Sequence, residues 1–262
     1  MKSMTDVTNK LFCPRYNNTL TIVFSSYLII IFVVGWHGQT RLSVAEELDG
    51  SPLMSDEEEI EFGRVVDDEI RRHFTVCTSY ELVQGLNEVG CNLVAVSDRK
   101  DLPFVFRALD SNTINAFSGP GGYIYVTTGL LQFVSNIDEM AGILGHEVAH
   151  IALRHAAKIL HESQISRPIL PDDPDKIEKM LKMFQYYTIE YEKEADLLGV
   201  SYAYKAGYDP NGLPDFMETI LVGSLERGMP GFFSFILIYR LQWPARIDAI
   251  REYIASSLPE KK

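Results

Sequence analysis

Two histidines separated by three residues, with a glutamate directly after the first, are the residues of this chain best suited to chemistry. They are His146, Glu147 and His150. At about 3.6 residues per turn, positions i and i+4 lie on one face of a helix, so both imidazoles can reach a single metal ion. Zinc held by neutral imidazoles lowers the pKa of a bound water, and the Glu147 carboxylate can take the proton and later pass it to a leaving amine. The pattern therefore predicts hydrolysis of peptide bonds.

A third ligand has to come from another part of the chain. One extension of the motif requires Gly at position 153 and His at position 156, but this chain has Leu153 and Ala156. Further along, Glu192 and Asp196 are four residues apart in a stretch with a helical pattern. One of them could bind the metal while the other hydrogen-bonds a ligating imidazole. An ordinary solvated acidic helix face is the alternative interpretation of this stretch taken alone.

These residues belong to a longer, collinear series of motifs. The series covers residues 55–63, 97–99, 102–104, 114–126, 144–150, 192–196 and 206–210. In these motifs the chain resembles the HtpX/BepA/LoiP/Oma-type zinc metallopeptidase family, a group of gluzincins that has Ste-type prenyl proteases among its relatives. The resemblance implies one Zn²⁺ per chain, with His146, His150 and Glu192 as ligands. It also implies that Asp196 supports the site and that Glu194 is the weaker alternative ligand.

The resemblance further implies that a strand over residues 123–126 is a sheet edge beside the cleft, on which an extended substrate can pair. Ile124 and Val126 alternate with polar and aromatic residues, which indicates a strand with one core face. An ordinary hairpin strand without a binding partner is the alternative interpretation. The candidate substrate-binding residues are Asn115, Ala116, Phe117, Gly122 and Tyr123.

The C-terminal part departs from the family pattern. Many relatives carry a late His-Pro followed by Arg-Ile, whereas this chain has Trp and Pro at 243–244 shortly before Arg246. If the late histidine of relatives steadies an oxyanion or blocks the resting site, that function is absent here or belongs to Arg246, Arg240 or Tyr239. We therefore take Arg246 as a second candidate catalytic residue beside Glu147.

Periodicity and turn residues predict an α+β fold that is mainly helical, a gluzincin-type domain with a small antiparallel sheet and a central His-Glu-x-x-His helix. Ser55 and Glu58 form an expected capping box. On a continuous helix His155 is rotated about 140° from the face of His150, so we expect it to cap or pack. A proline-containing loop over 163–175 could gate the cleft. The expected helices cover residues 55–73, 80–96, 138–161, 176–206, 210–225 and 244–256, and the expected strands cover 104–110 and 123–127.

An apolar run over residues 20–36 follows Lys2, Lys10 and Arg15 and precedes acidic residues. It predicts an export signal or an N-terminal membrane anchor whose positive end stays in the cytoplasm. Its length lies between those of a signal core and a membrane-spanning helix, so whether it is cleaved stays open. We therefore divide the chain into residues 1–42, an export signal or membrane anchor with a linker, and residues 43–262, a zinc metallopeptidase domain. The expected location is the cell envelope, either anchored in the inner membrane facing the periplasm or exported to the periplasm.

Composition and cysteine content set further limits. The chain has 262 residues, of which 46% are hydrophobic, and a formal net charge of -12. These values suit one ordinary core and argue against nucleic acid as a partner. Cys77 and Cys91 follow the apolar run, and in an oxidising compartment they could form an intramolecular disulfide. Two buried thiols are the alternative.

Two functions are compatible with these residues. The first is a zinc-dependent endopeptidase that hydrolyses peptide bonds of unfolded or misassembled cell-envelope proteins. The second is a metal-bound, weakly proteolytic, chaperone-like quality-control module that binds such proteins through the same cleft. Both keep the ligands, but only the enzyme depends on the Glu147 carboxylate. A prenyl-protein protease is disfavoured, because the chain has one membrane-length segment and a lipid-cleaving chamber needs several.

Overall fold

The computed structural model describes residues 54–162, 188–226 and 242–259. Several features expected from the sequence lie outside the described residues: the apolar run over 20–36, the loop over 163–175, the first part of the helix over 176–206, Tyr239 and Arg240. The division of the chain at residue 42 therefore stays a prediction. In the part of the chain that is described, no helix is both long and apolar enough to cross a membrane.

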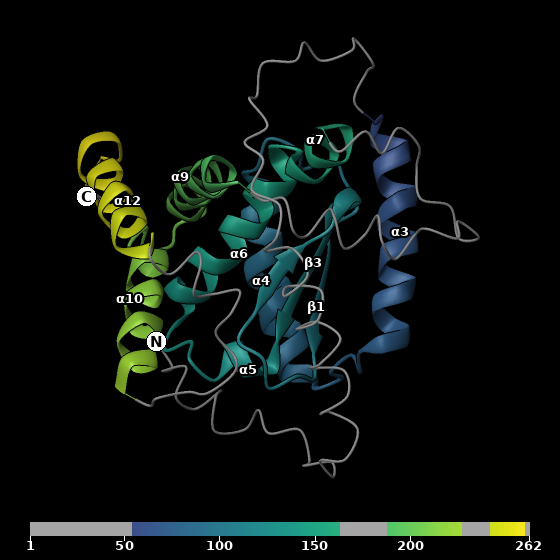
Figure 1. The fold of residues 1–262 in the computed structure, drawn as a ribbon, viewed down its shortest axis with the longest axis horizontal. Helices are drawn as coiled ribbons and strands as arrows, with labels where there is room; N and C mark the ends of the chain where they lie inside the picture. Colours follow the sequence, from purple (N-terminus) through teal and green to yellow (C-terminus); the bar gives the residue numbers. More distant parts are fainter. Residues whose placement is uncertain (1–53, 163–187, 227–241, 260–262) are drawn as a thin grey trace, which may run out of the picture.

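Helices surround a small sheet and extend away from it on one side (Figure 1). Helix α3 lies on one side of the sheet and α4 and α6 lie on the other, while α9, α10 and α12 pack beyond α6. The predicted α+β, mainly helical fold is confirmed. The helices are α3 (Asp56–His73), α4 (Tyr80–Ala95), α5 (Thr128–Leu131), α6 (Ile137–Ala152), α7 (His155–Glu162), α9 (Ile189–Lys205), α10 (Gly212–Glu226) and α12 (Trp243–Ser257), with a 3₁₀ turn η2 (Pro120–Gly122). The strands are β1 (Val105–Leu109), β2 (Ala116–Ser118) and β3 (Tyr123–Thr127).

The sheet is mixed, with the strand order β1-β3-β2. Strand β3 runs parallel to β1 and antiparallel to β2, so the expectation of an antiparallel sheet holds for one of the two pairs. The expectation that residues 123–126 form a sheet edge is wrong, because β3 lies between the other two strands. The tight turn η2 folds β3 back against β2, and β1 pairs with the other side of β3. The edge strand next to α6 is β2.

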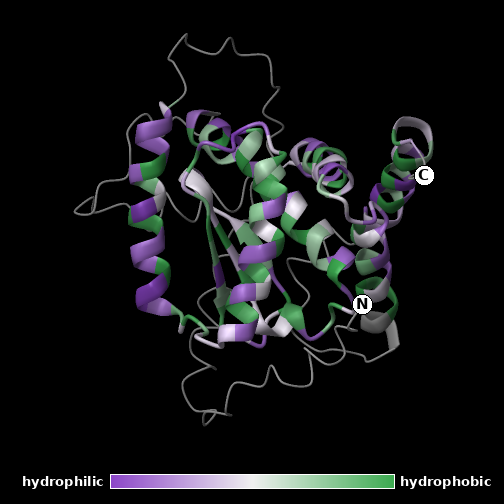
Figure 2. Ribbon diagram, turned by 180° about the vertical axis from the view of Figure 1, so that it is seen from behind, coloured by the Kyte–Doolittle hydropathy of each residue, from purple (hydrophilic) through white to green (hydrophobic). Residues whose placement is uncertain are grey.

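Helix α3 begins at the predicted capping box. The Ser55 Oγ accepts a hydrogen bond from the Glu58 backbone N–H, and a Glu58 carboxylate oxygen accepts one from the Ser55 N–H at 2.7 Å. These bonds satisfy donors that the first helical turn leaves without partners. The helix is largely hydrophilic with interspersed hydrophobic residues (Figure 2), and its buried face packs with Leu109 and Tyr125 of the sheet.

The expected continuous helix over 138–161 is broken. Helix α6 ends at Ala152 and α7 begins at His155, because Arg154 adopts a left-handed backbone with a φ of 60°. Such a conformation is costly for a residue with a Cβ and persists only where the surroundings hold it. Here the Arg154 Nε donates to the buried Glu59 carboxylate of α3 at 2.6 Å, and a second guanidinium nitrogen donates to the Met54 carbonyl. The break is therefore held from outside the helix.

The suggested disulfide between Cys77 and Cys91 is wrong, because both residues are thiols. Cys77 is buried in the main core, and its backbone N–H donates to the Ala108 carbonyl of β1. Cys91 lies on the exposed face of α4, so the alternative of two buried thiols holds for Cys77 alone. A disulfide requires two Cβ atoms that point at each other, which these positions do not provide.

Candidate metal centre

Helix α6 places the two histidines of the motif side by side. The Nε2 atoms of His146 and His150 are 2.9 Å apart, as the i, i+4 spacing leads one to expect. The Asn136 side chain caps the start of α6 by accepting from the Glu139 N–H, which fixes where the helix begins. The C-terminal half of α6 therefore presents both imidazoles in one direction.

Helix α9 brings the acidic residues to the same place by crossing α6 at very close range. A Cβ atom on Gly199 would lie 2.6 Å from the backbone nitrogen of His146, and a Cβ on Gly145 would lie 2.7 Å from the Gly199 carbonyl oxygen. Only residues without a side chain allow this approach. The glycine pair therefore sets the distance between the histidines on α6 and the acidic residues on α9.

Glu192 completes a cluster of three groups that could hold a metal ion. Its carboxylate oxygens lie 3.7 Å from the His146 Nε2 and 3.5 Å from the His150 Nε2. One ligand atom from each of His146, His150 and Glu192 lies within 4.8 Å of the other two. Two imidazole nitrogens and one carboxylate oxygen are a donor set that zinc accepts.

The two imidazoles differ in their electrostatic surroundings. Burial, together with the charge on His146 and His155, lowers the pKa of His150 well below its ordinary value, which keeps it neutral as a ligand must be. Burial also lowers the pKa of His146, but the hydrogen bond and charge of Asp196 outweigh it, so the pKa of His146 is raised. The residues present therefore fit a metal ion, which would take the place of the proton on the His146 Nε2 and leave the Nδ1 proton that faces Asp196.

Glu147 is almost fully buried, with 6% of its surface exposed. Burial raises the pKa of its carboxyl group, and a hydrogen bond from the Ser118 side chain acts in the opposite direction. Ser118 is the last residue of β2 and was not among the residues that the sequence suggested. The feature of the sequence that could have identified Ser118 is the two-residue period of a strand, which places it on the same face as the suggested residue Ala116.

Asp196 is buried between His146 and the C-terminal helix. Its Oδ1 lies 3.0 Å from the His146 Nδ1, and its two oxygens accept from the Arg246 Nε and Nη2 at 2.7 and 2.8 Å. Burial raises the pKa of Asp196, but hydrogen bonds from His146 and Arg246 outweigh it and lower that pKa. Asp196 therefore stands where a residue that orients His146 has to stand.

Arg246, which the sequence suggested as a catalytic residue, contacts carboxylates of the cluster. In addition to its two bonds to Asp196, its Nη1 lies 3.0 Å from the Glu192 Oε2. Burial lowers the pKa of Arg246, but the two carboxylates outweigh it and raise that pKa, so the guanidinium stays charged. These contacts suit the positioning of Glu192 and Asp196.

Replacing Arg246 with Met is expected to lower the free energy of unfolding of the metal-free protein by about 3 kcal/mol, because it leaves two partly or fully buried carboxylates without their cation. Urea denaturation in the presence of a chelator measures this. Arg251→Met on the same helix is the control, since Arg251 is 40% exposed and pairs with the exposed Asp215 and Glu218. Its loss should stay below about 1 kcal/mol. Equal losses in the two variants would contradict the assigned contacts.

The remaining suggested residues lie in other places. Glu194 does not join the cluster as an alternative ligand, because it lies 3.2 Å from the Nε2 of the buried His155. His155 is buried, in line with the expectation that it packs. It does not lie on a different face from His150, however, because its Nδ1 is 2.8 Å from the Nδ1 of His150. The break at Arg154 causes this difference, since it turns α7 away from the axis of α6.

The five suggested substrate-binding residues lie along the β2–β3 hairpin. Ala116 and Phe117 belong to the edge strand, and Asn115 precedes it, with its carbonyl accepting from the Thr127 N–H. Gly122 and Tyr123 are at the other end of the hairpin, in the turn and at the start of the central strand. The structure therefore places only the first three beside a sheet edge.

Comparisons with known proteins add a family and several relatives. Residues 83–169 match the profile of Peptidase family M48. The chain is 25% identical over 159 residues to the beta-barrel assembly-enhancing protease of Escherichia coli (strain K12), covering 53% of this chain and 33% of that protein. The chain is 28% identical over 158 residues to the protein of the same name in Yersinia pestis, covering 53% of this chain and 32% of that protein.

A third relative is "Metalloendopeptidase OMA1, mitochondrial" of Bos taurus, which is 30% identical over 149 residues, or 50% of this chain and 28% of that protein. The chain thus spans about a third of the length of these relatives. The family match includes His146 and His150 and ends before Glu192, Asp196 and Arg246. The family match therefore says nothing of these three residues, and their contacts are known only from the structure of this chain.

Proposed function

We propose that this chain, whose residues 83–169 match Peptidase family M48, is a zinc-dependent endopeptidase that hydrolyses peptide bonds of unfolded or misassembled cell-envelope proteins. The observation that carries the proposal is the cluster of His146, His150 and Glu192, whose ligand atoms lie within 4.8 Å of one another beside the buried Glu147. The proposal assigns one Zn²⁺ per chain to this cluster.

Glu147 acts as the general base and then as the general acid. Zinc, when bound, lowers the pKa of a water molecule and polarises the carbonyl group of the scissile bond. The Glu147 carboxylate takes the proton of the attacking water and passes it to the nitrogen of the leaving amine, so that no covalent bond to the protein forms. Burial raises the pKa of this carboxyl group, which makes it a stronger base near neutral pH. The hydrogen bond from the Ser118 side chain orients it.

The outer side of β2 supports the binding of an extended polypeptide. Asn115 and Gly119 are bonded to β3 through their backbones, and residues of an antiparallel strand alternate in direction. The backbone groups of Ala116 and Ser118 therefore point away from β3, and none of the described strands pairs with them. An extended substrate can add to such an edge by backbone hydrogen bonds. This mode suits unfolded chains, because it requires no particular side chains.

Two features support the cell envelope as the location. The apolar run over residues 20–36, with basic residues before it, has the features of an export signal or inner-membrane anchor. The relatives from E. coli and Y. pestis are named for β-barrel assembly, and transmembrane β-barrels belong to the bacterial outer membrane. The protein would then face the periplasm, either attached to the inner membrane or released from it.

Removal and return of the metal test the proposal. The full chain is stripped with a chelator, and cleavage of unfolded casein is followed before and after zinc is added back. Cleavage is expected to fall by at least about 100-fold on stripping and to return at about one equivalent of zinc per chain. Metal content is measured by mass spectrometry on the same samples. Undiminished cleavage by protein that has been shown to contain no metal would refute the proposal.

A further inference from the structure

A second histidine lies behind one of the two histidine ligands. The His155 Nδ1 is 2.8 Å from the His150 Nδ1, and the His155 Nε2 is 3.2 Å from a carboxylate oxygen of Glu194. His155 is fully buried, and its ring stacks on Tyr191 with 4.4 Å between the ring centroids. Glu194 is half exposed at the surface of α9. The side chains of His150, His155 and Glu194 thus form a line from the metal cluster to the solvent.

The polarity of this line follows from the ligand role of His150. The His150 Nε2 faces His146 and Glu192, so it is the nitrogen available to a metal. A neutral imidazole that binds metal through Nε2 carries its proton on Nδ1, and that proton needs an acceptor. The facing His155 Nδ1 can accept only if it carries no proton. The proton of His155 is then on Nε2, where it can be donated to Glu194.

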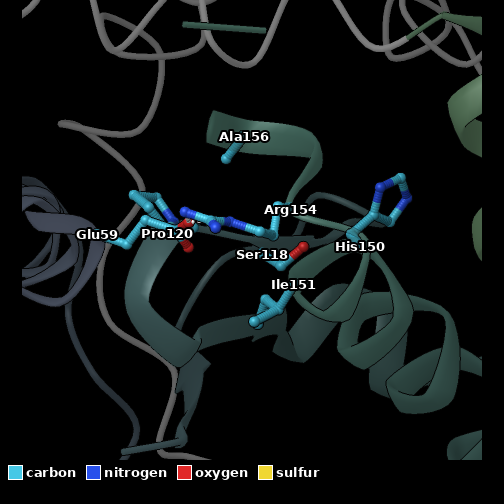
Figure 3. A pocket seen from close by; sticks show the side chains of 8 residues that line it. Glu59, Ser118, Pro120, His150, Ile151, Arg154 and Ala156 are labelled. Carbon is cyan, nitrogen blue, oxygen red and sulfur yellow. Dashed lines mark hydrogen bonds and ion pairs between the residues drawn. The ribbon is translucent and has the colours of Figure 1, made fainter. Parts of the chain in front are cut away.

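The break between α6 and α7 is what makes this contact possible. On a continuous helix His155 would lie on a different face from His150. The left-handed Arg154 turns the chain so that His155 comes to lie behind His150. Figure 3 shows Arg154 and Glu59 pointing toward each other at one end of a pocket that has His150 at its other end. A strained residue directly before His155, held by an ion pair to a buried carboxylate, indicates that the position of His155 matters.

We propose that His155 and Glu194 form a hydrogen-bond chain that fixes the ring orientation and the tautomer of His150 as a metal ligand. The inference rests on the proposed function, since it assumes that His150 binds metal. His146 is oriented directly by the carboxylate of Asp196, whereas His150 reaches its carboxylate through a second imidazole. His155 is therefore a positioning residue, and its loss should weaken metal binding without removing a ligand.

Two substitutions of His155 separate this role from simple packing. His155→Phe keeps an aromatic ring for stacking on Tyr191 but cannot accept from His150, and it is expected to lower zinc affinity about 10–100-fold. His155→Asn loses the ring but has an amide oxygen near the place of Nδ1, so it is expected to lose less. Competition with a chromophoric chelator on the full chain measures both. Zinc binding by the Phe variant that equals or exceeds that of the Asn variant would overturn the inference.

Two further measurements do not depend on substituting His155. Long-range ¹H–¹⁵N correlation spectra of the zinc-loaded wild type should show the proton of His155 on Nε2, and a proton on Nδ1 would overturn the inference. Glu194→Ala should weaken zinc binding more than Glu190→Ala, which removes the same charge from the exposed first turn of α9. Equal effects would also count against it. If the wild type cleaves casein and binds zinc, and His155→Phe binds zinc with the same affinity, this inference alone is refuted. If the wild type binds no zinc, the proposed function is refuted.

Discussion

Replacing Glu147 with Gln is expected to lower the rate of peptide-bond cleavage by about 10³-fold while the protein keeps its metal. The amide has the shape of the carboxylate but cannot take a proton from water. Glu147 is not a member of the cluster of possible ligands, so the donor set for the metal is unchanged. The side chain is buried, so that bulk water cannot easily replace it as a base. Casein cleavage by wild type and variant, at equal and verified zinc content, measures the effect.

The same helix offers a matched control for this substitution. Glu139 lies in the first turn of α6, is buried like Glu147, and accepts from the Ser135 N–H at 2.7 Å. Glu139→Gln places the same amide on the same helix, away from the cluster, and should leave the cleavage rate unchanged. Equal cleavage by wild type and Glu147→Gln would exclude Glu147 as the base. Zinc-loaded wild type that binds casein without cleaving it would instead favour the chaperone-like module.

Features within a single helix could be predicted from the sequence. The relation between His146 and His150, and that between Glu192 and Asp196, depend only on the helical period, and the structure shows both pairs on one face each. The capping box at Ser55 is likewise local and is confirmed. The spacing of the two carboxylates suggested that one of them binds the metal, and the resemblance to a family assigned that role to Glu192. Neither pair specifies a distance to the other.

Features that depend on contacts between distant residues could not be predicted. The left-handed conformation of Arg154 is held by Glu59, which is 95 positions away in the chain. The residues around Arg154 contain no glycine or proline that would predict a helix break there. The position of His155 behind His150 depends on that break. The order of the strands depends on which strands pair, and the alternation of residues in β3 is the same for an edge strand and a central one. Arg246 was selected from the sequence, but its ion pairs with Glu192 and Asp196 were not predicted.

Replacing Gly199 with Ala is expected to lower cleavage by about 100-fold, because it displaces the acidic residues of α9 from the histidines of α6. The added Cβ would lie 2.6 Å from the His146 backbone nitrogen and 2.7 Å from the Gly145 carbonyl carbon, so the two backbones must move apart. Overpacking of this kind also costs about 1–3 kcal/mol of stability. Zinc affinity should fall together with activity, since Glu192 and Asp196 both move with α9. Cleavage, zinc competition and urea denaturation are measured on the same variant.

Gly85→Ala is the control, because it makes the same chemical change in a helix where a Cβ meets nothing within 4 Å. Alanine is a better helix former than glycine, so this variant should gain about 0.5–1 kcal/mol and keep its zinc affinity and activity. If Gly199→Ala binds zinc as tightly as Gly85→Ala does, the close crossing of α6 and α9 does not set the geometry of the cluster. If zinc affinity is lost in Gly199→Ala alone while the protein stays folded, the distance between the two helices is what turns two pairs of residues into one metal site.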